Sequence, residues 1–419
     1  MTDGRDAAAS APPFRRFLAG RGALWAVFLL VHGGLAWLNL NAPGLPLGDV
    51  TGVYLRWAEN AANGWVRMGI DTPWVYPILA FAPMAAALAF GAASYAQTWL
   101  LMVTALDAVA FSVLIGTARL SRTRRIAAWW WLVFLALLGP IAMGRIDAIT
   151  VPFAILGLLM AAGRPRVAAV LLTIGAWLKV WPAALLAALV IAARRRREVA
   201  GIAFALSIGI LGVSLFAGAG LNAFGFIEEQ AGRGLQIEAP LAIAWLWQIV
   251  AGSQTVHIVY SQDILTFQID GPGAEAAAAL TTPMMAIGVL AVVLLGVRAV
   301  RRGAAFSLVL PPLALALPVV LMLANKVGSP QFVTWLAAPV VLGLVYRPAR
   351  FAVPALLAAA IALFTHIIYP YWYGWLLVAD PAFVFLLTVK VVLLVALLVW
   401  AARALWQAGA RRDPAPHAT

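Results

Sequence analysis

The sequence contains no cysteine and only four histidines among its 419 residues. Without cysteine the chain forms no disulfides and no thiolate metal sites, and four scattered histidines are too few for a zinc site. The P-loop, GxSxG and HExxH patterns are also absent. We therefore expect no metal and no cofactor, and the sequence argues against nucleotide-binding, serine-hydrolase and zinc-protease sites.

Charged residues are scarce as well, at 11% of the chain, while hydrophobic residues make up 64%. A soluble domain has about a quarter of its residues charged. Apolar runs of about 17–25 residues recur along the chain, long enough to cross a hydrocarbon core of roughly 30 Å as helices. The period-two alternation of a membrane barrel is not visible. The composition predicts an all-α polytopic membrane protein with about 11–13 transmembrane helices.

Basic residues outnumber acidic ones, 29 against 16, which gives a formal net charge of +13. The arginines sit in short clusters between apolar runs, as the positive-inside rule describes, so we expect contacts with anionic membrane lipids. Because no basic domain lies outside the membrane, we expect no nucleic-acid partner. The clusters are Arg15, Arg16 and Arg21; Arg119–Arg125; Arg164 and Arg166; Arg194–Arg197; Arg298–Arg302; Arg347 and Arg350; and Arg411 and Arg412.

This rule predicts a multi-pass protein of the cell membrane with one transmembrane domain, residues 23–402. Residues 1–22 and 403–419 are then cytoplasmic tails, and the loops 42–75, 220–278, 325–330 and 369–376 face the extracytoplasmic side. In the 220–278 loop we expect one embedded helix, near Pro240–Val250.

The middle of the chain does not fit simple alternation of spans. The three arginine clusters within residues 119–197 all favour the cytoplasm, yet alternation places only the last of them there. Two interrupted segments resolve the conflict: 168–193, broken at Lys179-Val-Trp-Pro182, and 76–92, which is short and contains Pro77 and Pro83. Proline breaks a helix, and broken helices are tolerated where they line a protein cavity. The alternative is that the charge bias is overridden and the spans simply alternate.

Asp49 is the first candidate for chemistry, in a polar loop just beyond the first apolar run. A carboxylate at the membrane boundary can accept a proton from a substrate hydroxyl. The simpler interpretation is an N-cap for a helix that begins at Val50, since Asp is a favoured cap residue.

Two further candidates lie at interruptions of the apolar runs. Arg145 and Asp147 occupy a turn between two runs, where a local Arg–Asp pair is the simpler interpretation. Lys179 lies within a run, where a cation costs at least ~2.5 kcal/mol unless it is paired or hydrated. A phosphate is a natural partner for it, and a lysine reaching to the interface from a helix end is the alternative.

The densest polar run outside the predicted spans extends from Glu228 to Glu238. Arg233 is suited to bind a phosphate through two parallel hydrogen bonds, and Gln236 and Glu238 are suited to bind sugar hydroxyls. The alternative is a solvated loop. Other candidate substrate contacts are Tyr76, Gln230, Lys326, Gln331, His366 and Tyr373; for His366 and the neighbouring aromatics the alternatives are a hydrogen-bonded interfacial histidine and an interfacial belt.

With these motifs in order, residues 24–375 resemble membrane glycosyltransferases of the GT-C fold that use polyprenyl-phosphate sugars, in particular the actinobacterial α-mannosyltransferases of glycosyltransferase family 87. The motifs that carry the resemblance are Asp49 in the first outer loop, Tyr76-Pro77, the turn Gly144-Arg145-Ile146-Asp147, Lys179-Val-Trp-Pro182, Arg233 to Glu238, and Ser329-Pro330-Gln331 with Trp335. The turn departs from the family's GQ-x-N pattern, because a cation and an anion replace two amides.

The resemblance implies a hexosyltransferase of cell-envelope biosynthesis. A sugar, in many family members mannose, moves with inversion from a polyprenyl phosphate to an acceptor hydroxyl on a glycolipid or glycan, and Asp49 is the general base. A secondary transporter or lipid flippase is the alternative from another class, since Asp107 and Lys179 lie within spans, although the transporter hallmark of internal repeats is not evident. A third interpretation, a non-catalytic membrane scaffold, would leave the outer polar residues without a role.

Overall fold

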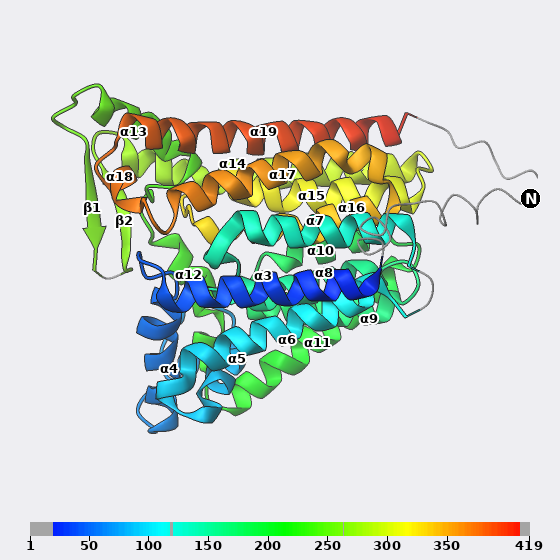
Figure 1. Cartoon of the computed structure of the whole chain (residues 1–419), viewed down its shortest axis with the longest axis horizontal. Helices are drawn as coiled ribbons and strands as arrows, with labels where there is room; N and C mark the ends of the chain where they lie inside the picture. Colours follow the sequence, from blue (N-terminus) through cyan, green and yellow to red (C-terminus); the bar gives the residue numbers. More distant parts are fainter. Residues whose placement is uncertain (1–19, 118–119, 263, 411–419) are drawn as a thin grey trace, which may run out of the picture.

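The computed structural model is a bundle of helices lying side by side (Figure 1). It describes residues 20–117, 120–262 and 264–410, without the side chains of residues 230 and 231. Among these residues, eight helices are long and apolar enough to cross a membrane, which confirms the polytopic helical class. They are α3 (Arg21–Asn41), α6 (Tyr95–Ile115), α7 (Arg122–Leu138), α11 (Arg196–Phe216), α14 (Ala274–Arg301), α15 (Phe306–Leu323), α17 (Pro348–Ile368) and α19 (Pro381–Ala408).

Four shorter helices fill the interior: α8 (Ile146–Met160), α9 (Pro165–Leu178), α10 (Pro182–Ala192) and α16 (Ala337–Tyr346), the last preceded by the 3-10 segment η8 (Pro330–Leu336). At about 1.5 Å per residue, 10–15 residues span roughly 15–22 Å, less than a hydrocarbon core of about 30 Å. The ends of these helices are therefore recessed within the bundle. Side chains at these ends are candidates for a site inside the bundle.

Arginines that flank the long helices gather at one end of the bundle, and we call it the arginine end. Arg124 donates to the carbonyls of Val113 and Leu114, 3.0 Å away, where α7 begins and α6 ends. Arg347 at the start of α17 lies 3.5 Å from Ser307 at the start of α15. In Figure 1 this is the end at which α3 begins.

The opposite end, the polar end, carries the connecting segments. They are η1 (Val50–Tyr54, a π-helical turn), α4 (Leu55–Ala62), η2 (Ile78–Ala80), α5 (Phe81–Ala87), η3 (Leu88–Phe90), η4 (Ala92–Ser94), η5 (Gly139–Ala142), η6 (Gly220–Phe224), α12 (Gly225–Ala231), η7 (Pro240–Ala242), α13 (Ile243–Val250), β1 (His257–Ser261), β2 (Thr266–Asp270) and α18 (Tyr373–Leu377). The helix expected near residues 240–250 is confirmed. The antiparallel hairpin β1–β2, with His257 opposite Asp270, was not expected.

Both predicted interruptions are present. Helix α9 ends at Leu178, Lys179 is extended, and α10 begins at Pro182. Residues 78–90 form only short helical pieces, and the hydroxyl of Tyr95 at the start of α6 donates to Met84 at 3.0 Å. Segment 76–92 therefore stays at the polar end. Arg166 in the first turn of α9 pairs with Glu198 in the first turn of α11, so α9 and α10 enter and leave the bundle at the same end. The expectation of spans that simply alternate is wrong.

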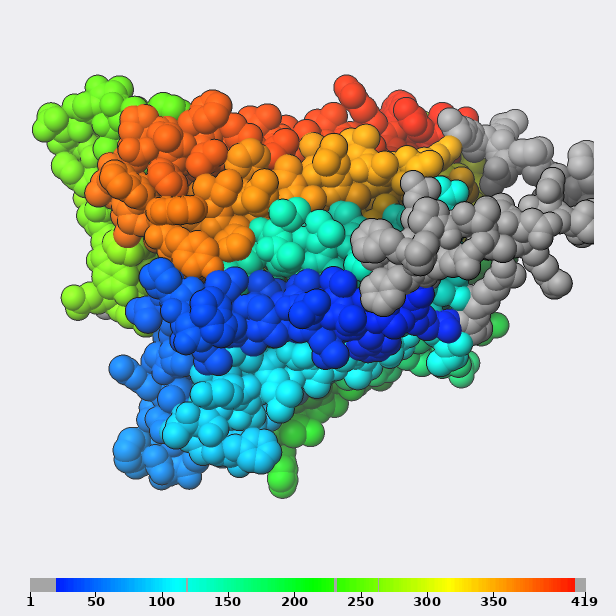
Figure 2. Space-filling view, in the orientation of Figure 1, coloured from blue at the N-terminus to red at the C-terminus, as the bar shows by residue number. Residues whose placement is uncertain are grey.

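Helix α3 lies along the outside of the bundle, as the space-filling view shows (Figure 2). Leu29, Leu30 and Trp37 are exposed on it, as expected for side chains that face lipid. Its inner face carries His32, which is 2% exposed and lies 3.1 Å from the carboxylate of Asp107 on α6. His32 also hydrogen-bonds the carbonyl of Phe28 at 3.0 Å. The ionisable Asp107 is thus paired within the bundle.

Removing one partner of the His32–Asp107 pair should destabilise the bundle more than removing both. We expect His32→Leu to lower the free energy of unfolding by about 3 kcal/mol, because Asp107 is left buried without its partner. The double variant His32→Leu/Asp107→Leu should recover most of that loss, because two apolar side chains leave no buried polar group without its partner. Unfolding in detergent measures the cycle; a double variant less stable than the single one contradicts this account.

Candidate functional site

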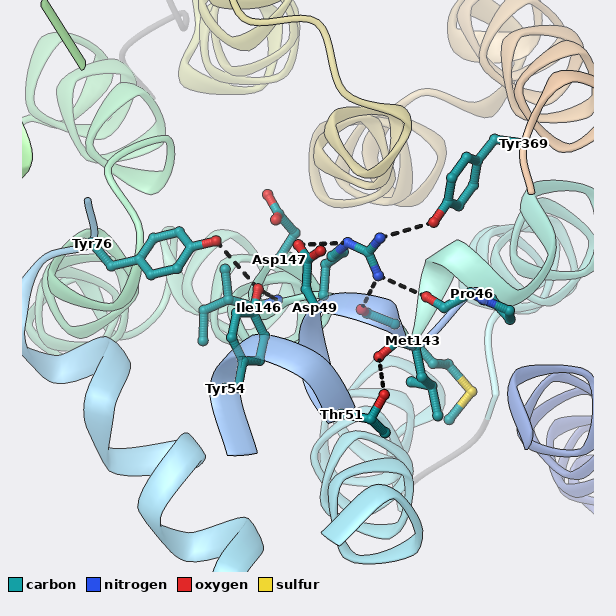
Figure 3. A network of polar contacts seen from close by, with 12 residues as sticks. Pro46, Asp49, Thr51, Tyr54, Tyr76, Met143, Ile146, Asp147 and Tyr369 are labelled. Atoms are coloured by element: carbon teal, nitrogen blue, oxygen red, sulfur yellow. Dashed lines mark hydrogen bonds and ion pairs between the residues drawn. The ribbon is translucent and has the colours of Figure 1, made fainter. Parts of the chain in front are cut away.

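Asp49 forms an ion pair with Arg145 at the polar end (Figure 3). Asp49 precedes η1 in the first connecting segment, and Arg145 precedes α8, so the pair joins two segments almost a hundred residues apart. Oδ2 of Asp49 lies 2.9 Å from Nε of Arg145, and the side chain of Asp49 is 40% exposed. A carboxylate is therefore held in one orientation while part of it stays accessible.

The interpretation of Asp49 as a side-chain cap is wrong. It occupies the N-cap position of η1 but makes no capping hydrogen bond, because its carboxylate turns to Arg145 instead. The expected local pair between Arg145 and Asp147 is wrong too. The two side chains make different contacts. Arg145 bonds Asp49, whereas Asp147, in the first turn of α8, is buried and pairs with Lys179.

Arg145 is fixed by four contacts in all. Besides the bond to Asp49, its Nη1 donates to the carbonyls of Pro46 and Gly144 at 2.7 Å, and its Nη2 donates to the hydroxyl of Tyr369 at 2.8 Å. Its side chain is only 10% exposed. A planar guanidinium with its donors occupied in this way is rigid, so it presents Asp49 in a defined position.

Asp147 pairs with Lys179 at the junction of α9 and α10. Its Oδ2 lies 2.8 Å from Nζ of Lys179, and its Oδ1 accepts from the indole of Trp335 at 2.7 Å. The side chain of Asp147 is fully buried, while that of Lys179 is 16% exposed. The stacked ring of Trp181, whose indole donates to Thr150, holds Trp335 from the other side. Lys179 is therefore a fixed cation and not a lysine reaching freely to the interface.

Tyr76 lies between the two carboxylate networks. Its hydroxyl is 3.2 Å from that of Tyr54, which in turn accepts from the amide of Ile146 at 3.4 Å, beside Arg145. Nζ of Lys179 lies 5.3 Å from the centre of the Tyr76 ring. The phenol thus connects the Asp49–Arg145 pair to the Asp147–Lys179 pair.

Two more cations lie close to this group. Burial lowers the pKa of Arg233, in the segment after α12. The nearby phenol of Tyr76 opposes part of that lowering. The pKa of Lys326 is lowered by burial and then by the charge of Arg233. Nε of Arg233 is buried and has no hydrogen-bond partner among the residues that the structure describes. A partly desolvated guanidinium of this kind favours an anionic ligand.

Gln236 and Glu238 are not in a solvated loop, because both are buried. The segment that carries them lies beside β2, with the amide of Ile237 donating to Phe267. The carboxylate of Glu238 pairs with Lys390 on α19 at 2.9 Å, and the two side chains are 2% and 6% exposed. Burial, and then the Glu238 carboxylate, raises the pKa of Tyr373. These contacts make Glu238 and Tyr373 anchors of the outer segment, and sequence reasoning missed Lys390.

The remaining predicted residues are less connected. Gln331 is half-buried at the start of η8, one residue before Phe332, whose ring lies 5.5 Å from Nζ of Lys179. His366 is half-buried. Its ring hydrogen-bonds the backbone of Leu137, as expected for a hydrogen-bonded histidine, while its Nε2 has no hydrogen-bond partner in the described part of the chain. The side chain of Gln230 lies outside the described residues.

Four cations, Arg145, Lys179, Arg233 and Lys326, thus share one region with the carboxylates of Asp49 and Asp147. Within the described residues no group of three or more histidines or carboxylates is placed to hold a metal. The arrangement is suited to bind an anion and to accept a proton beside it.

The Asp147–Lys179 pair should matter for stability. We expect Lys179→Met to lower the free energy of unfolding by about 3 kcal/mol, because it leaves a fully buried carboxylate unpaired. Lys179→Met/Asp147→Asn should be more stable than Lys179→Met, since the amide oxygen still accepts from Trp335 and carries no charge. Unfolding in detergent measures both, and equal stability of the two variants contradicts the pairing.

Comparison with known proteins gives one match, to the family model described as glycosyltransferase family 87, over residues 74–254. No curated protein and no solved structure is significantly similar to this chain. The matched range contains Tyr76, Arg145, Asp147, Lys179 and Arg233, while Asp49 and Lys326 lie outside it. Residues 74–254 are thus a glycosyltransferase family 87 domain, and the chain is a multi-pass membrane glycosyltransferase.

Proposed function

We propose that the region around Asp49 is the active site, and that it moves a sugar from a polyprenyl-phosphate donor to an acceptor hydroxyl. The ion pair of Asp49 with Arg145 is the observation that carries this proposal, because it gives a partly exposed carboxylate a fixed position. The resemblance to mannosyltransferases makes mannose the expected sugar.

The neighbouring cations suit the donor. A sugar phosphodiester carries a negative charge, which grows on the phosphate oxygens as the bond to the sugar breaks. Arg233 and Lys326 are partly desolvated and close to one another, and Lys179 is fixed beside Tyr76. Charge-assisted hydrogen bonds from such groups stabilise the leaving phosphate without a metal ion.

The transfer step balances with these groups. The acceptor oxygen forms a bond to the anomeric carbon as the bond from that carbon to the phosphate oxygen breaks. The hydroxyl proton passes to the carboxylate of Asp49, and the electron pair of the broken bond leaves with the polyprenyl phosphate. Attack from the face opposite to the phosphate inverts the anomeric centre. Base catalysis and positioning are the contributions asked of the protein.

The positive-inside rule supports an extracytoplasmic active site. The arginines that flank the long helices lie at the end of the bundle opposite to Asp49, as Arg124 beside the end of α6 and Arg166 beside Glu198 do, and such clusters favour the cytoplasm. A lipid-borne donor also suits a site recessed among short helices, because its polyprenyl chain stays in the bilayer. The alternative of a secondary transporter rests on the intramembrane pair of Asp107 with His32, and the family match favours the transferase over it.

Removing the base should abolish most activity. We expect Asp49→Asn to reduce kcat by 10²–10⁴-fold, the range for loss of general-base catalysis. The matched control is Asp71→Asn, which neutralises another carboxylate of the same outer segment, one paired with Arg67. The control should retain activity within about twofold. Transfer of radiolabelled mannose from a polyprenyl-phosphate donor by purified protein measures both, and an unimpaired Asp49→Asn enzyme removes Asp49 as the base.

Arg233 should act on donor binding. We expect Arg233→Gln to raise KM for the donor at least about tenfold, as for the loss of a hydrogen bond to a charged group, with a smaller effect on KM for the acceptor. Arg67→Gln is the control, because Arg67 is an exposed cation of another outer segment. Equal changes in the two KM values would argue against a phosphate contact.

A further inference from the structure

A cavity lies at the arginine end, far from Asp49 along the bundle axis. It encloses about 290 Å³ where α15 and α17 begin and α19 ends. Three arginines line it, Arg347, Arg350 and Arg403, together with Ser307 and Gln407. The size is near the lower end of ligand pockets, roughly 300–1,000 Å³, which suits a headgroup more than a large molecule.

No carboxylate in the described residues neutralises these arginines. Arg347 hydrogen-bonds Ser307 at 3.5 Å, and Arg350 and Arg403 make no hydrogen bond or ion pair within that part of the chain. Other arginines at this end are engaged: Arg166 pairs with Glu198, and Arg298 stacks on the ring of Trp406 at 3.7 Å. Three like charges around one cavity repel one another unless an anion joins them.

The backbone adds to the positive field of the cavity. Helices α15 and α17 both begin here, with 18 and 21 residues. The N-terminus of a helix carries a partial positive charge and favours an anion. The C-terminus of α19 carries the opposite partial charge, and Arg298 donates there to the carbonyl of Trp406 at 3.1 Å.

The remaining walls are apolar. Phe351 and Trp400 pack edge to face with ring centres 5.0 Å apart, and Leu308 and Pro312 line the cavity from α15. These helices are long and apolar enough to span a membrane. The apolar wall therefore lies at the level of the lipid hydrocarbon chains, and the arginines lie at the level of the headgroups. A free phosphate ion would leave the apolar side of the cavity unused.

We propose that this cavity binds the phosphate headgroup of an anionic phospholipid. The phosphate lies among Arg347, Arg350 and Arg403, and the glycerol and first methylenes of the acyl chains contact Phe351 and Trp400. Basic pockets between transmembrane helices are suited to such headgroups.

The test compares lipid binding by purified protein in neutral detergent, by native mass spectrometry. We expect phosphatidylglycerol to bind and phosphatidylcholine to bind at least about tenfold more weakly. The triple variant Arg347→Gln/Arg350→Gln/Arg403→Gln should lose at least about tenfold in affinity for phosphatidylglycerol, since each basic residue near the surface strengthens the attraction. The single variant Arg403→Gln should show a smaller loss, about threefold.

The matched control removes the same charge elsewhere at this end. Arg197→Gln/Arg301→Gln/Arg302→Gln changes three exposed arginines that do not line the cavity, and it should bind phosphatidylglycerol within about twofold of the wild type. Three results overturn the proposal: unchanged binding by the cavity variant, equal losses in both triple variants, or displacement of the lipid by millimolar inorganic phosphate. Sugar transfer does not enter the measurement, so the outcome is independent of the proposed reaction.

Discussion

Charge inside a membrane-spanning bundle must be paired, and this constraint organises the protein. An unpaired buried ion costs several kcal/mol, and the cost rises as water is excluded. The described part of the chain satisfies this requirement with buried pairs that join separate elements: His32 with Asp107, Asp147 with Lys179, and Glu238 with Lys390. The pair of Asp49 with Arg145 differs, because one partner is 40% exposed. In this pair a charged group is both fixed and accessible, as the role proposed for Asp49 requires.

The short helices determine where this pair lies. A helix of full span would carry Arg145 or Lys179 out to the headgroups, where water solvates the charge. Helices α8, α9 and α10 are too short for that, so Lys179 meets Asp147 inside the bundle. Trp335 enters the same level from η8 and closes the network. The interruption at Pro182 thus has a direct consequence for the site, since it sets the depth of a cation.

Much of the fold and part of the site could be predicted from the sequence. Long apolar runs give the spans, and the conflict between charge clusters and alternation locates both interruptions, because few topologies satisfy it. The pairings could not be predicted, since Asp49–Arg145 and Glu238–Lys390 join residues 96 and 152 positions apart. Local reasoning instead favoured a cap for Asp49 and a neighbouring partner for Arg145. The hairpin had a signal, the β-branched and aromatic residues of His257–Ser261 and the alternation in Thr266–Asp270, but its strands are short beside the spans.

The family match ends well before the contacts that complete the site. Within residues 74–254 lie Arg145, Asp147 and Glu238, yet each takes a partner from outside that range. Tyr369 binds Arg145, Trp335 binds Asp147, and Lys390 binds Glu238. Asp49, which precedes the range, completes the arrangement. The matched region therefore does not fix these charged side chains by itself. The helices after residue 254 act as its frame, because they hold its charged side chains in the positions on which the proposed reaction depends.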